Sequence, residues 1–177
     1  MDSKLKHLSR LRAQNLKVVD VACGFFSEPH SYLIDVDDHV FGLDLNSKTV
    51  YYRGDPDAAF AFSSLNDIGR VIGTIVTKKD PQSIPDKVRF FSQLITPRMV
   101  KERYESVHGV QLTEVFSSSE ESLRVATKRY NTKFESKDYL YYLSVALAQG
   151  VDKGLSFSWH SRDYLNPGER NWKWEKY

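Results

Sequence analysis

The sequence predicts an α/β fold in which a small mixed β-sheet is flanked by helices. A β-branched, apolar stretch at residues 17–26 is typical of a buried strand. An amphipathic helix is expected at residues 65–77, and a second apolar strand at residues 87–91. Strands that alternate with helices are typical of α/β domains, and 177 residues are enough for one domain with its own core.

The first third of the chain is expected to contain one helix followed by extended segments. Leucines spaced mostly by threes, with lysine and arginine between them, indicate an amphipathic helix that ends near Asn15, a residue that tolerates a left-handed cap. The strand at residues 17–26 is expected to break at Gly24. Further extended segments are expected at residues 49–53 and 59–62, and a short strand or helical turn at residues 40–43.

Capping residues mark the start of two helices in the remainder of the chain. Ser64 precedes the helix at residues 65–77 as its N-cap, and Asp67 suits the positive end of the helix dipole. Thr96 followed by Pro97 is a second helix start. That helix is expected to end at Gly109, followed by a strand at residues 111–116 and helices at 120–130 and 138–150. The tail, residues 159–177, is expected to wrap over the surface.

Composition argues against several classes of protein. A net charge of +2, from 25 basic and 23 acidic residues interspersed, gives no concentrated basic face for nucleic acid. No apolar run approaches the ~20 residues that span a bilayer, and the N-terminus lacks the apolar core of a signal peptide. The single cysteine, Cys23, cannot form an internal disulfide, which fits a reducing compartment. We therefore expect a cytoplasmic, soluble protein with no nucleic-acid or membrane partner.

The glycines argue against nucleotide binding. None of the nine follows a strand in a Gly-x-Gly-x-x-Gly or Gly-x-x-Gly-x-x-Gly pattern, and there is no Walker-type loop. Such patterns allow the backbone to approach a pyrophosphate at a helix N-terminus. We therefore expect no cofactor, and in particular no binding of NAD(P)H by this chain alone.

The order of motifs between residues 65 and 109 resembles the C-terminal half of NmrA-like and isoflavone-reductase-like proteins, which are atypical short-chain dehydrogenases/reductases. Asp67-Ile68-Gly69 opens an apolar helix, and Asp80-Pro81, a strand and a second helix follow in the family's order. The resemblance implies that residues 1–177 form a single NmrA-like substrate-binding domain. This would be a truncated Rossmann-like C-terminal substrate domain that lacks the N-terminal nucleotide-binding half.

The resemblance extends to the N-terminus. In isoflavone-reductase-like proteins a catalytic lysine opens a basic helix, which precedes a strand and a Gly-aromatic-Phe segment. Lys4 matches that lysine here, with Lys6 as the alternative, and Gly24-Phe25-Phe26 matches the segment. The sequence departs from the family at Lys17 and Val19, where proline and threonine are usual, so the alignment can shift by a residue or two. A solvated helix lysine is the competing interpretation of Lys4.

The family's substrate pocket is expected where the strand at residues 17–21 ends, because ligands collect at the carboxyl ends of strands in open sheets. The expected walls are Phe25, Phe26 and Tyr32, with Trp159 and His160 closing one side. Glu28 or His30 is the expected proton-transfer group. In the competing interpretation, Phe25 and Phe26 belong to the core and His30 is an exposed loop residue.

Two other features of the sequence resemble functional sites. The sequence Asp35-Val36-Asp37-Asp38-His39 could ligate a cation, but it lacks the spacing of known metal sites, and a solvated turn is the better interpretation. Cys23 has no sequence neighbour that would stabilise a thiolate, which indicates a small buried side chain. No metal is therefore expected.

The first functional hypothesis is a cofactor-independent isomerase, cyclase or dehydratase that acts on an aromatic or polyketide-like metabolite in specialised metabolism. The alternatives are a non-catalytic regulatory or partner-binding module and the substrate half of a split NAD(P)H-dependent reductase.

Absence of the nucleotide-binding half would leave the strand at residues 17–21 with an unpaired edge. We therefore expect a homodimer, with the strand at residues 18–21 or the helix at 4–14 at or near the interface.

Overall fold

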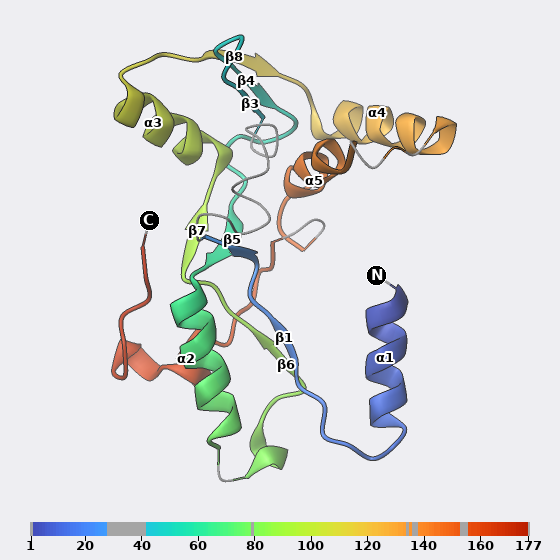
Figure 1. The fold of residues 1–177 in the computed structure, drawn as a ribbon, viewed down its shortest axis with the longest axis vertical. Helices are drawn as coiled ribbons and strands as arrows, with labels where there is room; N and C mark the ends of the chain where they lie inside the picture. The colour runs from blue at the N-terminus through green and yellow to red at the C-terminus, as the bar shows by residue number, and fades with distance from the viewer. Residues whose placement is uncertain are drawn as a thin grey trace.

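A computed structural model describes residues 2–27, 42–78, 80–133, 135, 138–152 and 156–176. Among these residues, five strands follow the first helix, and strands and helices are mixed after that until the last part of the chain, in which the elements are helical (Figure 1). The strands are β1 (Asp20–Ala22), β2 (Phe25–Phe26), β3 (Leu43–Asp44), β4 (Thr49–Tyr52), β5 (Phe60–Ser63), β6 (Lys87–Arg89), β7 (Gln93–Ile95) and β8 (Thr113–Phe116). The α-helices are α1 (Asp2–Arg12), α2 (Leu65–Val76), α3 (Pro97–His108), α4 (Ser119–Thr132), α5 (Tyr139–Leu147) and α6 (Arg162–Leu165), and the 3-10 turns are η2 (Pro81–Ser83) and η4 (Pro167–Glu169).

The strands form three small sheets. β1 pairs with β6 in parallel, β5 lies between parallel β2 and antiparallel β7, and β4 lies between antiparallel β3 and parallel β8. The expectation of small mixed sheets with flanking helices is thus confirmed, although the strands divide among three sheets where the sequence predicted one. Gly24 causes part of this division, because its φ of 70° bends the chain between β1 and β2.

Each sheet buries its own apolar cluster. The first lies between α2 and the β1–β6 pair and includes Val71, Val88 and Phe90. The second joins the rings of β2 and β5 to α5, and the third joins β3 and β4 to Leu112. Figure 1 shows α2 beside β1 and β6 in one part of the molecule, with α3, α4 and α5 around the other strands.

The helix ends follow the sequence chemistry. Ser64 Oγ accepts the backbone N–H of Asp67 at 2.9 Å, and Thr96 Oγ1 accepts that of Met99 at 3.1 Å. Gly109 ends α3 with a left-handed φ of 63°, and Asn15 has a φ of 57° beyond α1. These four local predictions are confirmed.

The C-terminal tail differs from the expectation. Instead of lying only over the surface, it buries Leu165, Asn166 and Trp174 almost completely. Leu165 and Trp174 belong to the cluster beneath α2, and the Trp174 ring lies 6.1 Å from that of Phe90. The tail is therefore part of the core, because its large rings fill space that β1, β6 and α2 leave open.

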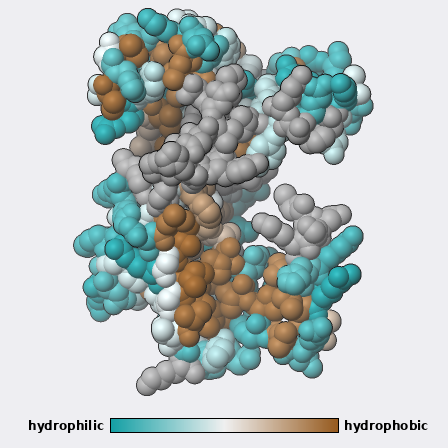
Figure 2. Space-filling view, viewed as in Figure 1, coloured by the Kyte–Doolittle hydropathy of each residue, from teal (hydrophilic) through white to brown (hydrophobic). Residues whose placement is uncertain are grey.

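The surface has a large apolar area on one face. Figure 2 shows this area over α2 and the strands beside it, extending toward α1. On α2, Leu65, Ile72 and Val76 have 52%, 42% and 72% of their surface exposed. In the part of the chain that the structure describes, no helix is long and apolar enough to cross a membrane.

Candidate functional site

The carboxyl ends of β1, β5 and β6 meet near the N-terminus of α2. Ala22 at the end of β1 lies opposite Arg89 at the end of β6. Ser63, which ends β5, donates its hydroxyl to the carbonyl of Cys23 at 2.6 Å. Ligands in open α/β proteins bind outside the carboxyl ends of strands, so this junction is the candidate location for a site.

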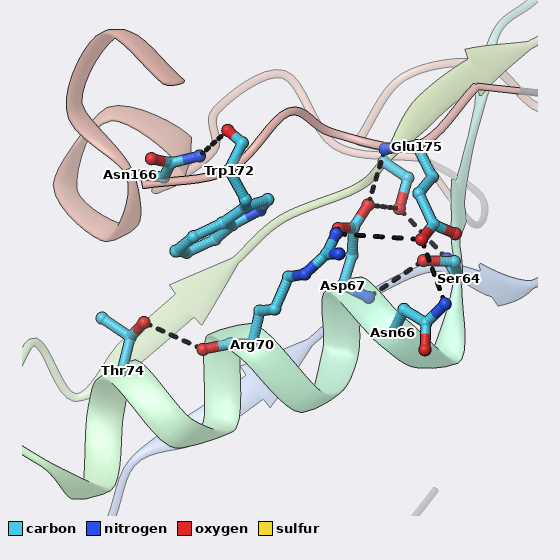
Figure 3. A network of polar contacts seen from close by, with 9 residues as sticks. Ser64, Asn66, Asp67, Arg70, Thr74, Asn166, Trp172 and Glu175 are labelled. Carbon is cyan, nitrogen blue, oxygen red and sulfur yellow. Dashed lines mark hydrogen bonds and ion pairs between the residues drawn. The ribbon is translucent and has the colours of Figure 1, made fainter. Parts of the chain in front are cut away.

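The polar centre of the junction is the carboxylate of Asp67, which is fully buried (Figure 3). Its Oδ2 accepts the hydroxyl of Ser92 at 2.6 Å and the backbone N–H of Glu175 at 2.9 Å. Its Oδ1 accepts an N–H of Arg70 at 2.9 Å, and Arg70 in turn lies 3.8 Å from the carboxylate of Glu175. Each oxygen of Asp67 is therefore engaged by donors from the protein.

This arrangement indicates a structural role for Asp67. A catalytic base must present a lone pair to its substrate. Asp67 instead uses its oxygens to join α2, the segment after β6 and the C-terminal tail. A buried charge that is paired and hydrogen-bonded in this way holds elements in register, and the catalytic chemistry, if present, must come from other side chains.

Next to the junction, five residues form a group that we call the Arg89 cluster: Arg89, Phe91, Phe157, Trp159 and His160. The guanidinium carbon of Arg89 lies 4.6 Å from the ring centre of Trp159 and 5.7 Å from that of Phe157. The Phe91 ring lies 6.0 Å from Phe157 and meets the His160 ring edge-on at 5.2 Å. Ser161 fixes the cluster to β6, because its N–H donates to the Arg89 carbonyl at 2.6 Å.

The Arg89 cluster offers three chemical functions to solvent. Trp159 is 44% exposed and presents a flat apolar face. Among the residues that the structure describes, Arg89 forms no ion pair, although its positive charge contributes to lowering the pKa of Asp152, whose main cause is hydrogen bonding from Ser158. His160 is exposed, and its Nδ1 accepts the N–H of Arg162 at 3.4 Å, which leaves Nε2 for other contacts.

The structure describes only some of the residues that the sequence placed in one pocket. Phe25 is buried among Phe60 and Phe62, with ring centres 6.2 and 5.8 Å away, whereas Phe26 is 41% exposed. Trp159 and His160 lie at the end of β6, next to the junction described above. Glu28, His30 and Tyr32 lie outside the described residues, as does the Asp35–His39 sequence. Lys4 lies in α1, and its side chain is also outside the description.

Sequence reasoning missed Arg89 and Phe91. Both lie in the strand predicted at residues 87–91, and nothing in the local sequence distinguishes them from other strand residues. Their proximity to Trp159 and His160 comes from contacts between segments about seventy residues apart, as the Arg89–Ser161 hydrogen bond shows. In the sequence, only the aromatic residues of the tail indicated this site, and they did not indicate that β6 is the strand that they contact.

Other chemistry near the junction is limited. Burial raises the pKa of the Cys23 thiol, which disfavours the thiolate that a nucleophile requires. Within the described ranges, no group of three or more His, Cys, Asp or Glu side chains could hold a metal ion. A separate cavity lined by Tyr52, Phe60 and Leu147 offers about 20 Å³, room for roughly one water molecule.

Comparison with known proteins adds no assignment. No family model matches the chain, and no curated protein matches it. The function must therefore be argued from the geometry of the Arg89 cluster and from the motif order described above.

Proposed function

We propose that this chain is a small-molecule-binding enzyme derived from an NmrA-like reductase. It would act without nicotinamide, as an isomerase, cyclase or dehydratase, on an aromatic or polyketide-like metabolite of specialised metabolism. The observation that carries the proposal is the Arg89 cluster, which combines an exposed indole, a cation and an imidazole at the end of the β1–β6 pair.

The three groups have complementary roles toward such a substrate. An aromatic ring can stack on Trp159. The Arg89 guanidinium can hydrogen-bond an oxygen on which negative charge develops. Nδ1 of His160 accepts a backbone N–H, so Nε2 is the ring nitrogen available to donate a hydrogen bond to that oxygen. Glu28, His30 and Lys4 remain the candidates for the general base that removes a proton from carbon.

Such a reaction needs no redox cofactor. In an isomerisation, the base takes a proton from a carbon beside a carbonyl, and the electron pair moves onto the oxygen. Arg89 stabilises that oxygen, and the proton returns at a different carbon. No net electrons leave the substrate, which agrees with the expectation that this chain binds no nicotinamide.

The first experiment is native mass spectrometry of the purified protein to detect a retained small molecule, followed by titration of aromatic candidates through Trp fluorescence. We expect Trp159→Ala to abolish stacking and Arg89→Gln to weaken binding of oxygen-bearing ligands.

With an identified substrate, His160→Ala should lower the rate by ~10²–10⁴. His108→Ala is the matched control, because His108 is exposed on α3. Wild-type rates in His160→Ala, Glu28→Gln and His30→Ala would refute the catalytic assignment.

The apolar area on α2 supports a second candidate function, a non-catalytic partner-binding module. Leu65, Ile72 and Val76 lie along one side of α2, and exposed apolar areas of this kind mark interaction surfaces. A separate nucleotide-binding chain could occupy the same face in a split reductase. Retention of a protein partner without any small molecule would favour this candidate over the enzyme.

A further inference from the structure

Two arginines lie against one tyrosine at the junction of β4, α4 and α5. The guanidinium carbon of Arg53, the residue after β4, lies 4.9 Å from the ring centre of Tyr141 on α5. That of Arg129 on α4 lies 4.5 Å from the same ring centre. The two guanidinium carbons are therefore at most about 10 Å apart, close to the screening length of physiological salt, so the two charges interact.

Arg53 is held in place by its neighbours. Its Nη1 donates to Ser144 Oγ at 3.2 Å, and the buried Ser144 donates its own hydroxyl to the carbonyl of Tyr141 at 2.8 Å. Burial is the main cause of a lowered pKa for the Arg53 guanidinium, and the positive charge of Arg129 acts in the same direction. The fold thus places one cation in a partly desolvated position beside a second cation.

No described carboxylate neutralises either cation. Among the residues that the structure describes, Arg53 and Arg129 form no ion pair with a carboxylate. Asp55 lines the same cavity as Arg53, and Glu135 and Asp138 line the same hollow as Arg129. Two like charges held together without a counter-ion favour the binding of an anion.

The structure has an open hollow beside Arg129, although Arg53 and Tyr141 do not line it. The hollow of about 390 Å³ is lined by Lys128, Arg129, Thr132, Lys133, Glu135 and Asp138. Lys133 is paired with Glu135 at 2.7 Å, which leaves Lys128 and Arg129 as the cations that no described carboxylate engages. The volume falls within the range of sites that hold small organic molecules.

We propose that Arg53, Arg129 and Tyr141 form a binding site for a doubly charged oxyanion, namely a phosphate group. A phosphate that bridges two guanidinium groups holds their central carbons roughly 7–8 Å apart, which is below the upper limit of about 10 Å set by their distances from the Tyr141 ring centre. Guanidinium groups suit phosphate because their N–H groups bind its oxygens in pairs. The site lies at different elements from the Arg89 cluster and does not depend on the function proposed for that cluster.

Isothermal titration calorimetry with inorganic phosphate, phenyl phosphate and acetate at pH 7.5 tests the assignment. We expect both phosphates to bind with one-to-one stoichiometry and acetate to bind at least tenfold more weakly. Tighter binding of phenyl phosphate would identify the ligand as an organic phosphate that also occupies the hollow. Equal binding of the two phosphates would identify free phosphate. Acetate binding as tightly as phosphate would overturn the proposal.

Two variants connect binding to the named residues. Arg53→Met and Arg129→Met should each weaken phosphate binding about tenfold or more. Arg129 is exposed, so its substitution tests the site even where Arg53→Met impairs folding. Arg124→Met on the same helix is the matched control, because Arg124 is paired with Glu121 at 2.7 Å and should be dispensable for binding. Phosphate affinity unchanged in Arg129→Met would also overturn the proposal.

Discussion

Asp67 connects three segments that are distant in sequence. One oxygen binds Ser92 and the backbone of Glu175, and the other binds Arg70 of its own helix. Ser92 also accepts the N–H of Ser64 at 3.0 Å, so the cap of α2 belongs to the same network. A carboxylate without solvent contact is tolerated only because these donors replace its water shell.

We expect Asp67→Asn to lower the free energy of unfolding by about 2–3 kcal/mol, because the amide places its own N–H groups against the donors of Ser92 or Glu175. Urea denaturation measures the change. Asn66→Ala is the control, since Asn66 is exposed and its side chain donates to one described partner, the Glu175 side chain, at 3.1 Å. Its effect should stay within about 0.5 kcal/mol. Equal effects of the two substitutions would contradict the role assigned to Asp67.

Glu105 gives a pH-dependent prediction. The backbone N–H of Leu112, at 2.7 Å, is the main cause of its lowered pKa, and Lys101 adds to it. The pKa of Glu105 is therefore lower in the folded protein than in the unfolded chain. The charged carboxylate stabilises the fold fully above about pH 4.5, the pKa of an unfolded glutamate. This stabilisation is lost as the pH falls through the pKa of the folded protein. The difference in unfolding free energy between wild type and Glu105→Gln should therefore shrink below about pH 4.5.

Urea titrations across this pH range check the Glu105 prediction. The matched control is Glu102→Gln, one turn earlier on α3, because Glu102 is exposed and forms no ion pair with a described residue. A difference between wild type and Glu105→Gln that stays constant down to pH 3 would show that the Leu112 contact does not stabilise the charged form.

At the scale of elements, the C-terminal tail stabilises the β1–β6 layer. Trp174 is 5% exposed, and Arg162 lies 4.8 Å from its ring centre. We expect Trp174→Ala to destabilise the protein by about 3–5 kcal/mol, through lost apolar burial and the cavity that remains. Thermal unfolding followed by circular dichroism measures this, with the exposed Lys173→Ala as control. A melting temperature unchanged by Trp174→Ala would mean that the tail is not part of the core.

The elements that could be predicted from sequence are those with local causes. Ser64 and Thr96 cap helices through backbone groups three residues away, and Gly109 ends one through its own left-handed φ. The division into three sheets, the strand β7 and the buried tail could not be predicted in this way. Asp67 and Glu175 meet across 108 positions, and no local pattern in the sequence records that pairing.

The same limit applies to the candidate site. The strand end at Gly24 was predicted because glycine has a local signature, and Trp159 and His160 were singled out as an aromatic and polar pair. Arg89 was not, since its role depends on two rings about seventy residues away. Sites assembled from distant segments require the fold before their residues can be recognised.

At the scale of the molecule, the connection from β5 to the N-terminus of α2 lacks the features of a nucleotide-binding turn. In the described chain, β5 leads into α2 through Ser63 and Ser64 without a glycine, and Ser64 already accepts the N–H of Asp67. A pyrophosphate needs free N–H groups at a helix start. We therefore expect no measurable binding of NAD(P)H by the isolated chain. Nicotinamide fluorescence titration checks this, and micromolar affinity would overturn it.

The apolar face of α2 lies beside a strand with an unpaired edge. Among the described strands, β1 pairs only with β6, whereas β6 is also hydrogen-bonded to Ser161 of the tail. An open strand edge and exposed apolar side chains such as Ile72 and Val76 both favour association. Two copies related by a two-fold axis would cover both features at once, since each copy presents the same face.

We therefore expect a homodimer in which α2, β1 or α1 lies at or near the interface. Ile72→Glu and Val76→Glu should each convert the dimer to a monomer, because a charge on each copy would be buried without a partner. Light scattering after size-exclusion chromatography at micromolar concentration measures the mass. Leu123→Glu on α4 is the matched control, because Leu123 is 47% exposed, close to the 42% of Ile72, but lies outside this face. A monomeric wild type, or a dimer that persists in both α2 variants, would show that α2 does not form the interface.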